Sequence, residues 1–393
     1  MKTQLSQLLL ILLLFITAEG KTQVYPVFGP EINVTINGLT FDAMEPFLSA
    51  DGTVLFFNNL NDGVNTRLYF ATKVDDSTFN LAGEVNGTNR PTPPHLDAVP
   101  DMDLFGAFYW TSDRGYPADL YNLHHGTFSA GSVTNIGRVR GDFNKNIQGW
   151  LVMDHGISLD GQFLYYNNAR FDGITPSPRE TELGIAQKVN DSVFNKILNS
   201  DNILQTIISD TNYIYYAPCV SSDNLELYYT RYLKDSITTS TLFEICVVVR
   251  NTSTDVYSVP SVLFSEPIGD LIEAPTLTTD KKIMYYHRKI PTTHRIVMRY
   301  RDTTLNVENL TKNEVFFTVY PNPSSNDITI EYSNLSDGYS YTIVNALGEI
   351  VLEEQKISSE KHEVNTSNLN SGTYLIQFHE NNRLVETIQF VKK

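Results

Sequence analysis

The chain has 393 residues, with 29 lysines and arginines against 45 aspartates and glutamates, so its formal net charge is −16. Hydrophobic residues make up 41% and charged residues 19%, which excludes a disordered chain and a bundle of membrane helices. The acidic balance excludes nucleic acids and anionic membrane surfaces as partners, because both require clustered lysine and arginine, and two cysteines exclude a disulfide framework.

The N-terminal segment has the features of a secretory leader. Lys2 supplies a positive charge, residues 8–16 form an uninterrupted apolar run, and Ala18 and Gly20 are small residues of the kind that a signal peptidase reads. The apolar run is about half of the roughly 20 residues that a helix needs to cross a bilayer. We therefore predict a signal peptide over residues 1–20 and no transmembrane segment after it.

Five segments of the body repeat one pattern, which is a short extended piece, a tight turn and a strand rich in aromatic residues. They begin at Glu45, Ala98, Asp154, Ala217 and Ala274, and their turns are 53 to 63 residues apart. Asp-Gly turns supply the positive φ angles that a tight hairpin requires. The turn aspartates are Asp51, Asp160, Asp223 and Asp280, and the second copy is expected to turn at residues 104–106 without an aspartate.

Each copy continues with a third and a weaker fourth strand. The third strands are predicted to begin at Arg67, Asp119, Glu182, Leu242 and Arg295, and only residues 194–208 suggest a short helix. Four antiparallel strands in such a repeat are typical of a β-propeller blade. The fifth copy lacks a fourth strand, and we predict that residues 31–38 supply it, which closes a ring of five blades and removes an open edge.

The repeats resemble the TolB-type (WD40-like) propeller repeat. The residues that carry the resemblance are Pro46, Ser49, Asp51, Gly52, Phe56 and Phe57 in the first copy, and Ser158, Asp160, Gly161, Tyr165 and Tyr166 in the third. The resemblance implies a five-bladed β-propeller over residues 21–314. It does not imply a function, because propellers serve as enzymes, lectins and scaffolds.

Residues 315–393 have alternating strands and turn signals that predict a small Ig-like β-sandwich. Their motifs occur at residues 320–323, 347–348, 371–374 and 390–393, and they resemble the type A C-terminal sorting domain of the type IX secretion system. The resemblance implies the type IX machinery as a partner and a secreted or outer-membrane cell-surface location in a Gram-negative bacterium. The fold class is therefore predicted as all-β, a five-bladed β-propeller followed by a sandwich sorting domain.

In a propeller the innermost strands begin around one central funnel, so residues at the start of each repeat are expected to converge there. The candidate catalytic residues are Asp42, Glu45, Asp154 and Glu273, and the candidate binding residues are Asp97, Asp101, His155 and Tyr216. Three roles are open to these carboxylates. They could cleave a glycoside as an acid and base pair, bind Ca²⁺, or act as hydrogen-bonding groups that hold the strand ends.

A long loop between the second and third strands of the third copy is a second candidate surface, since irregular loops on a rigid scaffold often bind ligands. Its candidate residues are Arg170, Asp172, Arg179 and Glu180. The paired aromatic residues of each copy are expected to pack between the sheets. The histidines lack zinc-ligand spacing, so no metal site and no cofactor are predicted beyond the Ca²⁺ alternative.

Two functions follow as hypotheses. The first is an exported β-propeller that binds a glycan or a protein. The alternative is a secreted carbohydrate-active enzyme, a glycosidase or lyase, that uses the funnel carboxylates. The enzyme hypothesis requires two carboxyl groups across an open pocket, and apolar side chains filling the funnel would count against it.

Overall fold

The computed structural model describes residues 24–302 and 317–393, except residues 174–176, 235–236, 291, 333–338, 346–348, 358, 360 and 381–382. The predicted signal peptide and the Leu347–Gly348 motif lie outside the described residues. Contacts divide the chain into two compact units, Met1–Asp302 and Thr303–Lys393, and each is described by itself.

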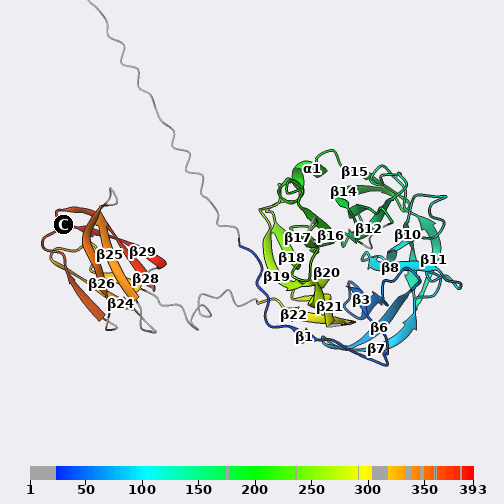
Figure 1. Ribbon diagram of the computed structural model, residues 1–393, viewed down its shortest axis with the longest axis horizontal. Coiled ribbons are helices and arrows are strands. Elements are labelled where there is room, and N and C mark those ends of the chain that lie inside the picture. Colours follow the sequence, from blue (N-terminus) through cyan, green and yellow to red (C-terminus); the bar gives the residue numbers. More distant parts are fainter. Residues whose placement is uncertain are drawn as a thin grey trace, which may run out of the picture. The chain divides into compact units, whose positions relative to one another are not determined.

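The first unit contains five β-sheets that follow one another along the chain (Figure 1). The first is built from β3 (Met44–Leu48), β4 (Val54–Asn58), β6 (Leu68–Asp75) and β7 (Thr78–Glu84), and the second from β8 (His95–Met102), β9 (Ala107–Ser112), β10 (Leu123–Ser129) and β11 (Ser132–Arg138), with the short β5 (Asn65–Thr66) beside β8. The third consists of β12 (Trp150–Ile157), β13 (Phe163–Arg170), β14 (Glu180–Asn190) and β15 (Val193–Lys196). The fourth consists of β16 (Tyr213–Val220), β17 (Glu226–Leu233), β18 (Leu242–Val249) and β19 (Ser261–Pro267). The fifth consists of β20 (Ile272–Leu277), β21 (Ile283–Ile290), β22 (Thr293–Tyr300) and β1 (Ile32–Asn33).

The five sheets are arranged around a common centre (Figure 1). The first strands of the sheets, β3, β8, β12, β16 and β20, contact one another in cyclic order, and β20 returns to β3. The all-β prediction is confirmed. The helices of the described part are short, namely α1 (Ser200–Ile203), α2 (Gln205–Ile208) and the 3-10 helix η1 (Ile268–Asp270), and the first two lie within the predicted helical stretch.

The N-terminal strand is divided between two sheets. Its first part, β1, pairs antiparallel with β22, where Ile32 lies opposite Met298, as predicted for the edge of the fifth sheet. Its second part, β2 (Thr35–Asn37), instead pairs parallel with β7 of the first sheet. One short segment therefore bonds the last sheet to the first.

The hairpin turns explain the sequence repeat in physical terms. In four sheets the hydroxyl of a serine or threonine donates to an aspartate two residues later, at 2.6 to 2.7 Å. The pairs are Ser49–Asp51, Ser158–Asp160, Ser221–Asp223 and Thr278–Asp280. In the second sheet Asp103 accepts from the N–H groups of Phe105 and Ala107, at 2.9 Å each. Asp103 stands at the position of Ser49, because its N–H and carbonyl bond to Ala107 and Gly106 as those of Ser49 bond to Val54 and Gly52. The turn therefore has no aspartate at the position of Asp51.

The third strand of the second sheet begins at Leu123, later than the predicted Asp119. The reason is that Asp119 accepts side-chain hydrogen bonds from Arg138 at 2.5 Å and Arg140 at 3.0 Å, which holds it in the connection before β10. The paired aromatic residues pack as expected. All ten are at most 1% exposed, namely Phe56, Phe57, Tyr109, Trp110, Tyr165, Tyr166, Tyr228, Tyr229, Tyr285 and Tyr286.

The second unit consists of two antiparallel sheets. One contains β23 (Phe317–Tyr320), β24 (Asp327–Tyr332) and β27 (Lys361–Asn365), and the other contains β26 (Ile350–Lys356), β25 (Tyr339–Asn345), β28 (Gly372–Glu380) and β29 (Arg383–Lys392). The two sheets share one apolar core that includes Phe317, Ile330, Ile376 and Phe390. The first and last motifs of the unit are bonded together, because Asn322 accepts from the Val391 N–H at 2.9 Å and donates to the Gln389 carbonyl at 3.0 Å.

Candidate functional site

Four of the five innermost strands bulge at the same place. The bulge is an X-Pro dipeptide whose first residue has φ between 51° and 55°, a backbone region that residues other than glycine rarely adopt. These dipeptides are Glu45-Pro46, Val99-Pro100, Ala217-Pro218 and Ala274-Pro275, and each lies where the register of the hairpin shifts. The third sheet differs, because its register shifts by one residue between Val152 and Asp154.

Side chains of the preceding sheet bind the N–H groups of these bulges. Val99 donates to Oδ1 of Asn58 at 3.1 Å, and Ala274 donates to Oγ1 of Thr230 at 3.1 Å. The Ala217 N–H binds the carboxyl group of Asp154. These bonds connect neighbouring sheets at the level of the bulge.

An equivalent hydrogen bond joins the last sheet to the first and so closes the ring. The Glu45 N–H donates to Nδ1 of His287 at 3.0 Å. Because Nδ1 accepts a hydrogen bond, the proton of the neutral imidazole lies on Nε2, which then donates to Oε1 of Glu273 at 2.8 Å. His287 is fully buried, so it links the backbone of one sheet to a carboxylate of another inside the protein.

Glu273 is held on both of its carboxylate oxygens. His287 donates to Oε1, and the hydroxyl of Tyr216 donates to Oε2. Burial alone would raise the pKa of Glu273, but His287 and Tyr216 together bring the pKa below its ordinary value. Glu273 is therefore ionised at neutral pH, while burial and the adjacent Glu273 charge raise the pKa of Tyr216 well above its usual value.

The pKa values of Glu45 and Asp154 are shifted in the opposite direction from that of Glu273. Burial raises the pKa of Glu45 to about 7, with His287 opposing and the charge of Glu273 adding to the shift. Burial also raises the pKa of Asp154 well above its ordinary value, helped by the charges of Glu45 and Glu273. The structure thus brings together Glu45, Asp154, Glu273 and Tyr216 as one interacting group, which we call the carboxyl cluster.

Glu45 and Asp154 are the members of the carboxyl cluster with an unused oxygen. Oε1 of Glu45 accepts from Nδ2 of Asn61 at 3.3 Å, whereas Oε2 of Glu45 and Oδ2 of Asp154 have no hydrogen-bond partner among the described residues. Asp42 lies at the edge of the cluster, where its Oδ1 accepts from the N–H of His294 at 3.1 Å. The ring of His294 is 5.4 Å from that of His287, and sequence reasoning assigned neither histidine to the site.

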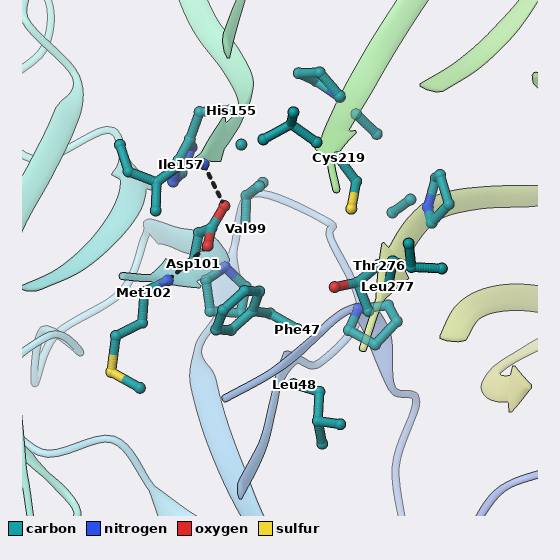
Figure 2. Close-up of a pocket in the computed structure, with 18 of the residues that line it drawn as sticks. Phe47, Leu48, Val99, Asp101, Met102, His155, Ile157, Cys219, Thr276 and Leu277 are labelled. Carbon is teal, nitrogen blue, oxygen red and sulfur yellow. Dashed lines mark hydrogen bonds between the residues drawn. The ribbon is translucent and has the colours of Figure 1, made fainter. Parts of the chain in front are cut away.

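Asp101 and Asp97 face structural partners, whereas neither ring nitrogen of His155 has a hydrogen-bond partner among the described residues. Asp101 accepts from the N–H groups of Met102 at 2.6 Å and Ile157 at 2.8 Å, so it ties β8 to β12 (Figure 2). Burial raises the pKa of Asp101 to about 8 and lowers the pKa of His155 to about 3. Asp97 is fully buried and faces Arg90, whose Nε is 3.7 Å from its Oδ2. The expected convergence does not extend to Asp97.

A cavity follows the centre of the ring along the innermost strands. Its polar lining residues include Glu45, Asp101, Asp154 and His155. Apolar residues such as Phe47, Ile157 and Leu277 make up about half of the wall, and they lie near Asp101 and His155 (Figure 2). The cavity offers about 90 Å³ to the centres of water-sized molecules, against about 560 Å³ for a pocket on the side of the ring. The centre of the ring is therefore narrow, and its wall is polar and apolar in about equal parts.

The loop candidates pair with one another. Arg170 donates to Glu180 at 2.8 Å, and Arg179 donates to Asp172 at 2.6 Å. These side chains are partly exposed, with 42% and 48% of the Arg170 and Glu180 side chains accessible. A role of this loop in binding stays a prediction.

Within the described ranges, no group of three or more histidine, cysteine, aspartate or glutamate side chains is arranged to hold a metal ion. The Ca²⁺ alternative stays a prediction. In the same part of the chain, every helix is too short or too polar to cross a membrane.

No curated protein matches the sequence. Solved structures similar to the chain include a family 117 glycoside hydrolase from the marine bacterium Zobellia galactanivorans, at 12% identity and a TM-score of 0.44, covering 72% of this chain and 92% of that one. An exo-β-1,3-galactanase from Phanerochaete chrysosporium has 13% identity and a TM-score of 0.44, and the match covers 93% of this chain and 100% of that one. A protein assigned as TolB from Agrobacterium tumefaciens has 13% identity and a TM-score of 0.30, and the match covers 90% of this chain and 82% of that one. All three TM-scores lie below 0.5, so neither the fold nor the activity of this chain follows from them.

Residues 318–393 match the family model of the secretion system C-terminal sorting domain. This match covers nearly all of the described part of the second unit. The predicted sorting domain is confirmed, and it indicates export of the chain to the cell surface or the medium by the type IX secretion system.

Proposed function

We propose that residues 21–314 form a five-bladed TolB-type β-propeller and serve as an exported binding module for a glycan. The cyclic contacts of the five innermost strands and the bond between β1 and β22 support the blade count. The shared turn hydrogen bonds support the repeat assignment. The sorting domain, which we assign to type A, places this module outside the cell or on its surface.

The observation that favours binding is the state of the three carboxyl groups. Both oxygens of Glu273 already accept hydrogen bonds, and Asp154 is only 4% exposed. Glu45 and Asp154 each keep one oxygen without a partner among the described residues, and Glu45 is the more accessible of the two. A buried acceptor without a donor costs about 1–3 kcal/mol, so a hydroxyl group of a ligand that donates to it would be favourable. Glycosides are cleaved by two carboxyl groups that both reach the substrate. Here Glu273 is bonded on both oxygens and Asp154 is almost fully buried, which favours binding over cleavage.

One observation favours the alternative of a carbohydrate-active enzyme. The pKa of Glu45 is raised to about 7, whereas the pKa of Glu273 is lowered, and paired carboxyl groups with separated pKa values are how glycosidases divide the acid and base roles. In that case Glu45 would act as the proton donor and Glu273 as the nucleophile or base.

A glycan array and a polysaccharide digestion screen with the chain lacking residues 1–20 separate the two functions. The binding proposal expects retention of a glycan without release of reducing ends. Glu45→Gln should weaken this retention about tenfold, the effect of losing roughly one hydrogen bond. Glu363→Gln, an exposed change in the second unit, is the control and should bind normally. Release of reducing ends that Glu45→Gln and Glu273→Gln both abolish would establish the enzyme instead. No retention of any glycan would contradict the proposed ligand.

A further inference from the structure

A pocket on the side of the ring lies between the third and fourth sheets, beside α1. Its wall comes from β13, β14, the segment before α1, the turn at Asn224 and the connection after β18. Much of the wall is apolar and includes Phe163, Ile197 and Leu198. Leu198 is fully exposed at this surface.

The charges that line this side pocket all have one sign. Lys188, Lys196 and Arg250 line it, and no aspartate or glutamate does, although the whole chain carries a net charge of −16. Lys188 is paired with Asp191 at 3.0 Å and Lys196 with Asp201 at 2.7 Å, both outside the wall. Among the described residues Arg250 has no carboxylate partner.

Arg250 is held in place by neutral groups. It is 7% exposed, its Nε donates to the Asn224 carbonyl at 2.9 Å, and its Nη2 donates to the Tyr165 hydroxyl at 3.0 Å. The guanidinium lies 4.4 Å from the ring centre of Tyr257. Its Nη1 is buried and has no hydrogen-bond partner in the described part of the chain. A buried guanidinium is ordinarily matched by an anion, because its charge is costly to remove from water.

We propose that the side pocket binds a small organic acid with an apolar body. The carboxylate of the ligand accepts a hydrogen bond from Nη1 of Arg250 and neutralises its charge. The hydrocarbon body lies against Phe163, Ile197 and Leu198. A neutral hydrocarbon would leave the guanidinium unmatched, and a sugar would leave the apolar wall without a partner. This site is separate from the glycan site at Glu45, and neither depends on the other.

The probe for this site is octanoate, with octanamide as its neutral counterpart, and binding to the chain lacking residues 1–20 is measured by titration calorimetry. We expect saturable binding of octanoate that is at least tenfold tighter than that of octanamide. Leu198→Glu places a carboxylate beside the pocket on an exposed side chain, so the fold is kept and octanoate binding falls at least tenfold. The matched control is Leu104→Glu, at a 57% exposed leucine of the second sheet, and it should bind as the unaltered chain does.

Arg250→Met tests the guanidinium directly. It should abolish the preference for octanoate over octanamide while tryptophan fluorescence confirms that the ring is folded. If this variant does not fold, Leu198→Glu and Leu104→Glu decide the outcome. Equal affinity for the two probes, or equal octanoate binding by the two glutamate variants, would overturn the proposal, as would the absence of octanoate binding.

Discussion

The N–H of Glu45 donates a hydrogen bond of 3.0 Å to Nδ1 of His287, and the two residues belong to the first and last sheets of the ring. The equivalent bonds elsewhere, from Val99 to Asn58 and from Ala274 to Thr230, join sheets that are consecutive in the chain. The bond to His287 differs from these, because it connects the last sheet of the ring to the first. It also orients the imidazole so that its other nitrogen donates to Glu273, which couples closure of the ring to the charge state of the carboxyl cluster.

Replacing His287 should destabilise the ring more than replacing Thr230. His287→Phe fills the space but leaves both the Glu45 N–H and Oε1 of Glu273 without a partner, so we expect a loss of about 2–4 kcal/mol in the free energy of unfolding. Thr230→Val leaves one N–H unpaired and should cost about 1–2 kcal/mol. Both tryptophans, Trp110 and Trp150, lie in the first unit, so urea unfolding followed by tryptophan fluorescence reports on the ring alone. An equal loss in both variants would contradict the role of His287.

The stability of the ring should fall as the pH rises from about 5 to 7. The pKa of Glu45 is about 7 in the folded protein and 4.5 in its ordinary state, so between these values the folded chain holds a proton that the unfolded chain releases. Unfolding therefore becomes easier with rising pH, by up to about 3 kcal/mol for this group. Glu45→Gln should flatten this part of the profile. If the free energy of unfolding of Glu45→Gln falls with pH as steeply as that of the unaltered protein, Glu45 is not the group that titrates.

Gly161 is expected to tolerate a side chain less well than Gly173. Both have positive φ, at 68° and 73°, so alanine strains the backbone at either position. A Cβ at Gly161 would also lie 2.4 Å from Oδ2 of Asp103, while nothing lies within 4 Å of one at Gly173. Asp103 cannot easily move, because its Oδ1 accepts two backbone N–H groups. We expect Gly161→Ala to cost about 2 kcal/mol and Gly173→Ala about 1 kcal/mol in urea unfolding.

Asn322 should hold the end of the sorting domain in place. Asn322→Ala removes the bonds to Val391 and Gln389, so the backbone amide of Val391 should exchange its hydrogen several times faster, which mass spectrometry can follow. Ser367→Ala is the control, since Ser367 bonds only locally to Asn365. Unchanged exchange at Val391 would show that Asn322 does not fasten this strand. Export of the variant measures whether the fastening matters for secretion.

The hairpins were predictable because their cause is local. Ser49 and Asp51 bond within a few residues of each other, and the same spacing recurs wherever the turn recurs. The start of β10 was not predictable, because Asp119 is held by Arg138 and Arg140, whose positions depend on the folded sheet. The division of the N-terminal strand between two sheets likewise depends on contacts with distant strands.

The candidate site was predictable only in part. Counting from the start of each repeat identified Glu45, Asp154 and Glu273, since each lies at or next to the residue where its innermost strand bulges. It could not identify His287, which belongs to a second strand and meets Glu45 only after the ring closes. Nor could it separate Asp97 and Asp101 from the carboxyl cluster, because the bulge at Val99-Pro100 redirects the strand between them.

The pairing of β1 with β22 has a consequence for the order of events during folding. Ile32 is synthesised among the first residues of the ring, and its partner Met298 among the last. The same segment also completes the first sheet, because β2 follows β1 in the chain and pairs with β7. A chain that lacks its last strands cannot close, so the assembled ring can form only once its entire length is present. Because this contact joins residues far apart in the sequence, closure is expected to be a late and slow step of folding.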